Sequence, residues 1–357
     1  MKRVLALVPS EVGYTPGQRS TIELWREPLE QAGFLVEFAP FETTALRKVL
    51  PLRGRILLKA REMFRSYGRR VRLLRDLSGF DAVYLYREAA LIGPALLERW
   101  VARRGLPIIY TLDDPLYVPY VSPASGLFSY LKFFGKVATI CKLSRVVIAN
   151  SRHHFEYARR YCKDVRQIPS VIDGAVYRHS PQLRRGTICV GWSGSSTTAP
   201  NLRLVVNALA EVARRTSYRL HVIGGGPIEI PGVECTAQPW RAESEVQDLR
   251  QFDVGLIPLP DNEWNRRKFN LKVAQYMALG IVPVASPLGS NPDVIEAGVD
   301  GFLASTTEEW TKYTELLVRD AALRARMADR AAHKAKEKFT LESQTPAIVD
   351  AFRSAAP

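Results

Sequence analysis

Lys268 and Lys272 stand where positive charge could bind an anion. The stretch RKFNLKVAQYMALG predicts a helix over about residues 270–279, with Lys268 just before it, Lys272 in its first turn and Gly280 at its end. Cations are unfavourable at a helix N-terminus unless an anion binds there, because the helix dipole is positive at that end. Two ammonium groups and the backbone N–H groups of a first turn would hold a diphosphate, with Arg266 as a further cation.

Gln275 lies one turn beyond Lys272 on the same predicted face, where its amide suits a ribose hydroxyl. The predicted strand VGLIPLP precedes this basic loop, and the predicted strand IVPVAS follows the helix. A basic loop that is simply solvated before a helix is the alternative interpretation.

Glycine-rich turns follow two further predicted strands in the second half. GWSGSS places Gly194 and Ser195 after one strand, where their backbone N–H groups could approach phosphate or sugar. VIGGGP places Gly225 after another strand. This turn lacks the GxGxxG pattern and an acidic ribose partner, which disfavours a nicotinamide-dependent enzyme.

Polar residues also follow the first predicted strand of the chain. In PSEVGYTPGQRSTIE, Ser20 and Glu23 have the spacing of a helix capping box. That arrangement would leave Gly17 free to approach a ligand and direct Arg19 into a cleft.

Two more strand ends in the first half carry charge. Arg87 and Glu88 follow the strand VYLY, and Asp113 and Asp114 follow IIYTL. One carboxylate could hydrogen-bond an acceptor, or Asp114 could cap a helix that begins at Pro115. Adjacent carboxylates also suggest a metal site, an interpretation that we disfavour.

The histidines and cysteines suggest no metal centre. His153 and His154 fall in the predicted first turn of a surface helix and are not expected to be catalytic. The four cysteines lack zinc-ligand spacing, and we expect buried, reduced thiols at Cys141, Cys162, Cys189 and Cys235.

These residues depend on strands that alternate with helices. Apolar runs appear in the order RVLALVP, LVEFAPF, AVYLYRE, PIIYTLD, RVVIANS and VRQIPSV, and a second series follows with TICVGWSG, RLHVIGGG, VECTAQPW, VGLIPLP and IVPVASP. Alternation of this kind predicts an α/β fold with two doubly wound parallel sheets. Ligands bind such sheets at the carboxyl ends of the strands, where the polar residues fall.

The predicted boundary between the two domains is the polar stretch YRHSPQLRRGT, residues 177–187. We expect an N-terminal domain over residues 1–180 and a second domain over residues 187–335. The segment 336–357 is predicted to form a C-terminal helix that packs back on the first domain.

Longer motifs surround all of these residues. The second half contains VGWSGSSTTAPNL, LHVIGGGP, AQPWRAESEVQDLRQFDVGLIPLPDNEW, RKFNLKVAQYMALGIVPVASPLGSN and GVDGFLASTTEEW, and the first half PGQRSTIELW, YREAALIGP, IYTLDDPLY and IPSVID. Together they resemble a retaining glycosyltransferase of family 4, whose GT-B fold has two Rossmann-like domains facing a cleft. The resemblance implies a UDP- or GDP-sugar as co-substrate, bound mainly by the second domain, an acceptor bound mainly by the first, and no metal or other cofactor.

The family signature is altered in this sequence. The usual pair of glutamates eight residues apart is replaced by Arg267 and Gln275, which makes this a Lys-rich variant. Lys268 and Lys272 are then expected to carry the diphosphate. By position, Trp240 resembles the family's base-binding residue and could stack on the nucleobase, although a core tryptophan is equally consistent.

The resemblance also implies a mechanism. The acceptor would attack the sugar on the face that the diphosphate leaves, and the leaving phosphate would accept the acceptor's proton. Lys268 and Lys272 are the expected catalytic residues, because they would stabilise charge on the departing phosphate. A sugar-nucleotide-binding protein without transfer activity and a sugar-nucleotide epimerase are the alternatives.

Much of the formal charge of +14 lies in one segment, Arg47–Arg75, which contains eleven Lys or Arg and one acid, Glu62. A helical stripe of apolar residues within it, including Ile56 and Phe64, predicts an amphipathic helix. The basic side is either solvated or attracted to anionic lipid or a phosphate-bearing acceptor. Nucleic acid is disfavoured, because no binding motif accompanies the charge. With no long apolar run, we expect a cytoplasmic protein that could be peripheral at the inner face of the membrane.

Overall fold

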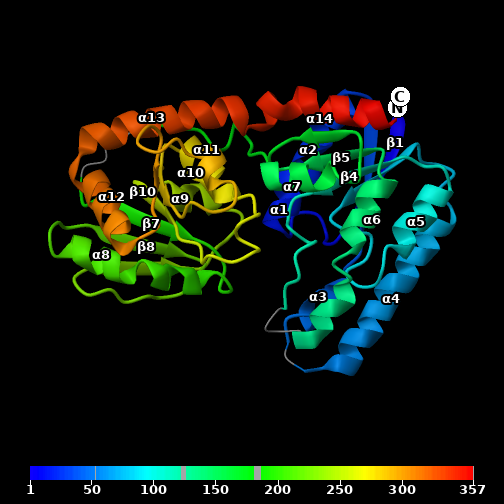
Figure 1. The fold of residues 1–357 in the computed structure, drawn as a ribbon, viewed down its shortest axis with the longest axis horizontal. Coiled ribbons are helices and arrows are strands. Elements are labelled where there is room, and N and C mark those ends of the chain that lie inside the picture. Colours follow the sequence, from blue (N-terminus) through cyan, green and yellow to red (C-terminus); the bar gives the residue numbers. More distant parts are fainter. Residues whose placement is uncertain (53, 122–125, 181–185, 357) are drawn as a thin grey trace. The chain divides into compact units, whose positions relative to one another are not determined.

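The computed structural model describes residues 1–52, 54–121, 126–180 and 186–356 (Figure 1). Internal contacts divide the chain into two compact units. The first contains Met1–Ser170, Arg267–Phe269 and Gln344–Pro357, and the second contains Val171–Arg266 and Asn270–Ser343. Residues 181–185 of the predicted boundary segment lie outside the described residues, as does Arg53 of the basic segment.

The first unit is built on a parallel sheet with the strand order β2-β1-β3-β4-β5-β6. Its inner strands β3, β4 and β5 are buried along their whole length, as expected for a parallel sheet covered on both faces. All six strands were predicted from their apolar runs: β1 (Lys2–Val8), β2 (Phe34–Pro40), β3 (Ala82–Tyr86), β4 (Ile108–Leu112), β5 (Val146–Ala149) and β6 (Val165–Gln167).

Helices of the first unit pack their apolar sides against this sheet. Leu74 and Ile140, for example, lie in one core cluster with Leu7 and Leu85 of the strands. The helices and helical turns are α1 (Pro16–Gln18), η1 (Arg19–Glu23), α2 (Leu24–Gln31), α3 (Thr44–Val49), α4 (Ile56–Arg75), α5 (Leu96–Arg103), η2 (Gly126–Lys132), α6 (Lys136–Leu143) and α7 (Arg152–Ala158).

The end of the chain contributes to the core of the first unit. The last helix, α14 (Leu341–Ala355), carries Phe352, which is fully buried. Its ring stacks on Tyr84 with centroids 5.7 Å apart and meets the edge of Phe34. The Lys2 ammonium donates a hydrogen bond of 2.7 Å to the carbonyl of Ala356. The two ends of the chain therefore lie together in this unit (Figure 1).

The second unit has its own parallel sheet, with the order β12-β11-β10-β7-β8-β9. Five of its strands were predicted, and the two-residue strand β12 was not, because two residues carry no periodicity. The strands are β7 (Cys189–Ser193), β8 (Arg219–Ile223), β9 (Glu234–Gln238), β10 (Val254–Ile257), β11 (Val282–Ala285) and β12 (Phe302–Leu303).

Helices of the second unit begin and end at recognisable signals. The helix predicted after the basic loop is α10, and Gly280 follows it with a φ of 70°, which favours glycine. Thr306 and Glu309 form a capping box at the start of α12. The helices and turns are η3 (Ala199–Leu204), α8 (Val206–Ala213), α9 (Glu245–Leu249), α10 (Leu271–Ala278), α11 (Asn291–Val294), α12 (Thr307–Arg319) and α13 (Ala321–Lys338).

Some local predictions were wrong. Cys141, Cys162 and Cys189 are buried as expected, but Cys235 is only partly buried. Ser20 and Glu23 form no capping box: the Ser20 hydroxyl donates to the Gly17 carbonyl, and the Glu23 carboxylate accepts from the Gly13 N–H and the Gln18 amide. The predicted apolar stripe of α4 is also interrupted. Met63 packs against the core, whereas the Phe64 side chain is 77% exposed.

The order of strands reverses once in each sheet, between β1 and β3 in the first unit and between β7 and β10 in the second. Loops at such a reversal spread apart at the carboxyl ends of the strands and leave room for a ligand. Among the described residues, no helix combines the length and apolarity needed to cross a bilayer.

Candidate functional site

Arg87, just after β3, joins the two carboxylates that follow β4. Its guanidinium Nε lies 2.9 Å from Asp113 Oδ1, and its Nη2 lies 3.1 Å from Asp113 Oδ2 and 2.5 Å from Asp114 Oδ2. Arg87 has a φ of 66°, a left-handed conformation that is unfavourable for residues other than glycine. The ion pairs therefore hold the side chain and its strained backbone in one place at the sheet edge.

Tyr86 and Gly17 complete this cluster in the first unit. The Tyr86 hydroxyl, which is fully buried, donates a hydrogen bond to Asp113 Oδ2. A Cβ atom at Gly17 would lie 2.6 Å from the Tyr86 hydroxyl and 3.3 Å from Asp113 Oδ2. Gly17 was expected to approach a ligand, and the structure shows that its own backbone covers the cluster closely.

The two carboxylates of the cluster differ in proton affinity. Burial raises the pKa of Asp113 even though the Arg87 guanidinium favours its charged form. Burial alone would also raise the pKa of Asp114, but the charge and hydrogen bond of Arg87 together with the charge of Lys268 outweigh it, and the pKa of Asp114 is lowered. Asp114 therefore holds its negative charge more firmly than Asp113 does.

Glu88 and Arg19, the other charged residues predicted for this site, have other surroundings than the Arg87 cluster. The Glu88 carboxylate lies 2.5 Å from the ammonium of Lys136, and both side chains are buried. Burial raises the pKa of Glu88 although Lys136 opposes the shift. This pairing suits a structural role for Glu88, whereas Arg19 is half-buried in η1.

His154 occupies the first turn of α7, as predicted, but it is fully buried and the expectation of a surface position was wrong. Its Nδ1 lies 2.9 Å from Asn150 Oδ1, and Asn150 donates in turn to the Asp113 carbonyl and the Ser170 hydroxyl. Nε2 has no hydrogen-bond partner among the described residues. Burial lowers the pKa of His154 to about 3, so the imidazole is neutral near pH 7.

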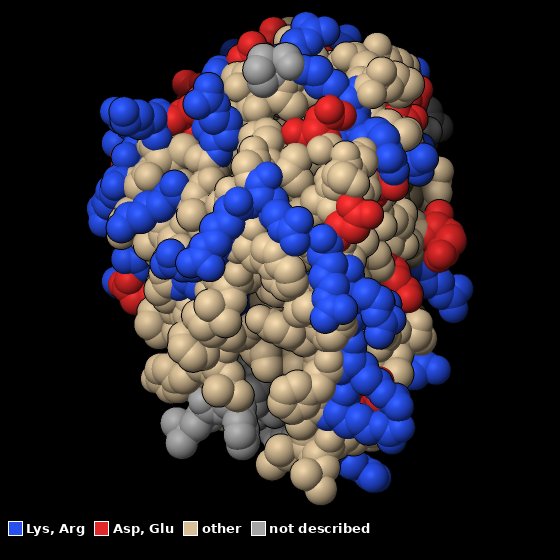
Figure 2. Space-filling view, turned by 90° about the vertical axis from the view of Figure 1, so that its right-hand side faces the viewer, with Lys and Arg blue, Asp and Glu red and all other residues tan. Residues whose placement is uncertain are grey.

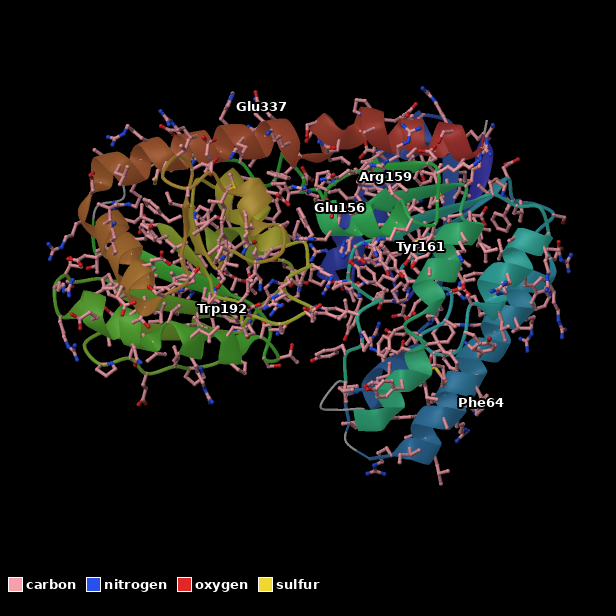
Figure 3. The ribbon with its side chains drawn as sticks, viewed as in Figure 1. Phe64, Glu156, Arg159, Tyr161, Trp192 and Glu337 are labelled. Atoms are coloured by element: carbon pink, nitrogen blue, oxygen red, sulfur yellow. The ribbon has the colours of Figure 1, made fainter. Side chains whose placement is uncertain are left out.

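Trp192, at the end of β7, is the centre of a second cluster, in the second unit. The side chain is 3% exposed, and Figure 3 shows it near the end of its strand. A Cβ atom on Gly194 would lie 2.1 Å from the indole, and one on Gly225 would lie 2.6 Å from it. The Lys272 ammonium lies 5.4 Å from the indole ring centroid. The turns after β7 and β8 and the start of α10 therefore meet at Trp192.

The backbone amides of the turn after β7 already have acceptors within the protein. The Gly194 N–H donates to the Ile223 carbonyl at 2.9 Å, and the Ser195 N–H donates to Thr198 Oγ1 at 3.0 Å. These bonds shape the turn, so a ligand at Ser195 would first meet the exposed hydroxyl and not the amide.

A hydrogen-bond network connects Gln275 with three residues from other parts of the second unit. The Gln275 amide nitrogen donates to the Tyr177 hydroxyl at 2.8 Å and lies 3.4 Å from Glu245 Oε1. The Glu245 carboxylate also accepts from Tyr177 and from Trp240 Nε1, each at 3.0 Å. Sequence reasoning identified Gln275 and Trp240 but missed Glu245 and Tyr177, because no spacing connects these four residues.

The three cations in and after the basic loop before α10 have different neighbours. Arg266 forms ion pairs with Asp261 at 2.6 Å and Glu263 at 3.2 Å on the exposed side of the loop. By its contacts, Lys268 belongs with the first unit and Lys272 with the second. The structure therefore gives each of these three cations a different environment.

Other parts of the described chain offer no rival site of this kind. Among the described residues, no group of three or more His, Cys, Asp or Glu side chains is placed to hold a metal ion. Two surface hollows of the second unit, of about 570 and 490 Å³, are lined mainly by helix residues such as Glu315 and Lys334. Neither contains a strand-end residue.

Comparison with known proteins agrees with this architecture. Residues 187–320 match the family model of Glycosyl transferases group 1. No curated protein sequence matches the chain. Sucrose-phosphate synthase from Thermosynechococcus elongatus is similar in structure with a TM-score of 0.71 and 13% identity, covering 99% of this chain and 98% of its own.

Two further solved structures are similar over the whole chain. HepE from Anabaena, in complex with UDP, has a TM-score of 0.70 and 17% identity over 99% of this chain and 100% of its own. TarM has a TM-score of 0.67 and 10% identity over 99% of both chains. The chain thus has the GT-B fold, and the unit that holds Trp192 and Gln275 is the one that resembles group 1 glycosyltransferases.

Proposed function

We propose that this protein is a retaining glycosyltransferase that moves a sugar from a nucleotide diphosphate sugar to an acceptor. The observation that carries the proposal is the position of Lys272, in the first turn of α10 and over Trp192, within the residues that match group 1 glycosyltransferases. One structural relative, HepE from Anabaena, has also been solved in complex with UDP-glucose. A UDP-sugar is therefore the first donor to test.

The second unit provides groups suited to each part of a nucleotide. Lys272 and the N–H groups at the start of α10 favour the diphosphate, because the helix dipole and the ammonium are both positive. Gln275 and Glu245 place an amide and a carboxylate side by side, which suits the hydroxyls of a ribose. Trp240, anchored by Glu245 through its indole N–H, offers an aromatic face to the base.

Lys268 is proposed to complete the diphosphate site. Arg266 is a weaker candidate, because its guanidinium is already paired with two carboxylates. Gly194, Ser195 and Gly225 would contribute by the shape of their turns, which pack closely around Trp192.

The acceptor is proposed to bind at the Arg87 cluster of the first unit. Asp114 keeps its negative charge and is 17% exposed, so it can accept a hydrogen bond from a hydroxyl group. Arg87, itself held by Asp113, fixes the position of Asp114, and the backbone of Gly17 in α1 packs closely against Arg87 and Asp113. Arg19 would act as a further contact from η1.

In the proposed reaction the bond between the anomeric carbon and the diphosphate oxygen breaks, and its electron pair stays on the phosphate. The acceptor oxygen forms its bond to the same face of the sugar, and its proton passes to a phosphate oxygen. No side-chain base is needed for this transfer. Lys268 and Lys272 would stabilise the charge that develops on the phosphate, each by about 2.7 to 4 kcal/mol.

The test is nucleotide release from UDP-, GDP-, ADP- and dTDP-sugars, measured without an acceptor and then with cell extract. Release from one donor, faster with extract and about 100-fold to 1,000-fold slower in Lys272→Ala, is the expected result. Lys312→Ala is the matched control, because its ammonium lies 5.7 Å from the Tyr313 ring, on a helix outside the site. Tight donor binding without release would instead indicate a binding protein, and conversion of the donor sugar without release an epimerase.

Retention is tested separately by following the anomeric signals of the sugar released to water in a proton NMR time course. The first anomer formed should have the configuration of the donor. An inverted first product would overturn the proposed mechanism but leave the glycosyltransferase proposal standing.

A further inference from the structure

One face of α4 carries large apolar side chains that the first unit leaves uncovered. Leu57 is 87% exposed and Phe64 is 77% exposed. Their spacing, with Arg61 between them, places them on the same side of the helix. In Figure 3 the labelled Phe64 side chain points away from α4. Such side chains in water are unfavourable, which suggests an apolar partner.

The same face is strongly basic. Arg61, Arg65, Arg72 and Arg75 of α4 are all exposed. The neighbouring helix α5, which packs against α4, adds exposed Arg99 and Arg103 and an apolar residue, Leu96, that is 57% exposed. Figure 2 shows Lys and Arg side chains gathered in a band on this side of the molecule.

The acids of the two helices offset only part of this charge. Within Ile56–Arg75 and Leu96–Arg103 the acids are Glu62 and Glu98, which are 5% and 3% exposed. Glu62 forms ion pairs with Arg65 at 2.7 Å and with Arg61 at 3.9 Å, and Glu98 accepts a hydrogen bond from the Ala89 N–H. Within the described residues of the two helices, Arg72 and Arg75 have no acid as a partner. The exposed surface of both helices is therefore cationic and apolar.

We propose that this α4–α5 face binds the surface of a bilayer that contains anionic lipid, with Leu57 and Phe64 inserted among the acyl chains. Arginines on the same face would keep their guanidinium groups at the headgroups while their aliphatic stems lie along the apolar layer. The complementary charge of anionic headgroups supports this partner. A soluble polyanion would match the cations but offer nothing to Phe64 and Leu57. The proposal does not depend on sugar transfer.

The electrostatic part is tested by co-sedimentation of the full chain with vesicles. Wild type should bind vesicles of phosphatidylcholine with about 30% phosphatidylglycerol, but not vesicles of pure phosphatidylcholine. Salt at about 0.5 M should dissociate the protein from the anionic vesicles, because it screens the charges. The double variant Arg72→Gln/Arg75→Gln should bind about 25-fold more weakly, at about fivefold per charge. Arg326→Gln/Arg330→Gln, an exposed pair on α13, is the matched control and should bind like wild type.

The insertion part is tested with Phe64→Ser, which should weaken vesicle binding by about tenfold or more. Leu204→Ser is its control, because Leu204 is 50% exposed in the second unit. In Phe64→Trp, the added indole fluorescence should shift to shorter wavelength with anionic vesicles. All of these positions are exposed, so thermal melting should show folded proteins.

Three results would overturn the proposal. They are no binding to anionic vesicles at low salt, equal binding to pure phosphatidylcholine, and binding that Phe64→Ser leaves unchanged while polyphosphate competes fully. The last result would identify the face as a polyanion site without insertion.

Discussion

The Lys272 ammonium lies 5.4 Å from the centroid of the Trp192 ring, and two glycine turns pack against the same indole. A cation is attracted to the face of an indole, so Trp192 supports Lys272 at the N-terminal end of α10. The position of the proposed phosphate-binding lysine thus depends on how tightly Gly194 and Gly225 fit Trp192.

The first prediction concerns Gly194→Ala. The added Cβ would lie 2.1 Å from the Trp192 ring and 2.7 Å from Thr198 Oγ1, so the indole must shift. We expect a loss of about 1 to 3 kcal/mol in unfolding free energy, together with a raised KM for the sugar nucleotide. Gly68→Ala is the control, because a Cβ there meets nothing within 4 Å and alanine favours the helix. Urea unfolding and donor kinetics measure both effects, and a Gly194→Ala protein that matches wild type would contradict the packing argument.

The second prediction concerns Gln275→Glu. The Gln275 amide nitrogen lies 3.4 Å from Glu245 Oε1, so a carboxylate at 275 would face a like charge in a buried position. We expect lower stability and weaker nucleotide binding at pH 7, with partial recovery below pH 5 or so, where one carboxyl can be protonated.

The charge-swapped protein Gln275→Glu/Glu245→Gln checks this prediction. It keeps one carboxylate and one amide in contact, so it should regain much of the stability that the single variant loses. Thermal melting and nucleotide titration calorimetry measure the two effects. A double variant no more stable than Gln275→Glu alone would show that the two side chains do not interact.

Sequence pattern was sufficient for both sheets but not for the contacts within the sites. Strands such as β3 and β10 could be predicted because apolar runs bounded by turns follow from burial alone. The two-residue β12 could not. The sequence also predicted that Lys272 lies in the first turn of a helix and that Asp114 follows a strand. In each sheet, the loops after parallel strands meet at one edge, so such residues can be located from the order of strands and helices.

The missed contacts share a physical cause. Glu245 and Tyr177 bind Gln275 across long stretches of chain, and no local periodicity reports such a pairing. The burial of His154 depends on how α7 packs in three dimensions, and two adjacent histidines resemble a polar surface. Phe64 fitted an apolar stripe by spacing alone, yet the described residues of the first unit leave 77% of it exposed.

The third prediction concerns Arg87→Met. Removing the guanidinium would leave Asp113 and Asp114 as adjacent carboxylates without their shared cation. We expect the pKa of Asp114 to rise and stability near neutral pH to fall by about 1 to 3 kcal/mol, a range that allows for the partial exposure of Arg87. Arg87→Lys should recover little, because an ammonium cannot reproduce the two-pronged contact.

The Arg87 variants are tested by two measurements, the KM for the acceptor and the free energy of unfolding. The acceptor KM should rise in both variants, while nucleotide binding in the second unit should stay unchanged. Arg145→Met, at an exposed position just before β5, is the control. If donor affinity fell as much as acceptor affinity, the assignment of the Arg87 cluster to the acceptor would be wrong.

The fourth prediction concerns the pH dependence that buried His154 adds to stability. Burial lowers its pKa in the folded protein to about 3, whereas an unfolded histidine titrates near 6.5. Between these values the unfolded state binds the proton and the folded state does not, so stability falls as pH falls, by about 1.4 kcal/mol per pH unit. Above pH 6.5 or so this contribution is fully present.

His154→Gln removes that titration. The difference in urea-unfolding free energy between wild type and His154→Gln should therefore stay constant above about pH 6.5 and shrink from there down to about pH 4.5. His153→Gln, one position earlier and only half-buried, is the matched control and should leave the slope of wild type in place. A wild-type advantage over His154→Gln that stays constant across this range would mean that His154 takes up its proton in the folded protein, and that the imidazole beside Asn150 is accessible to water.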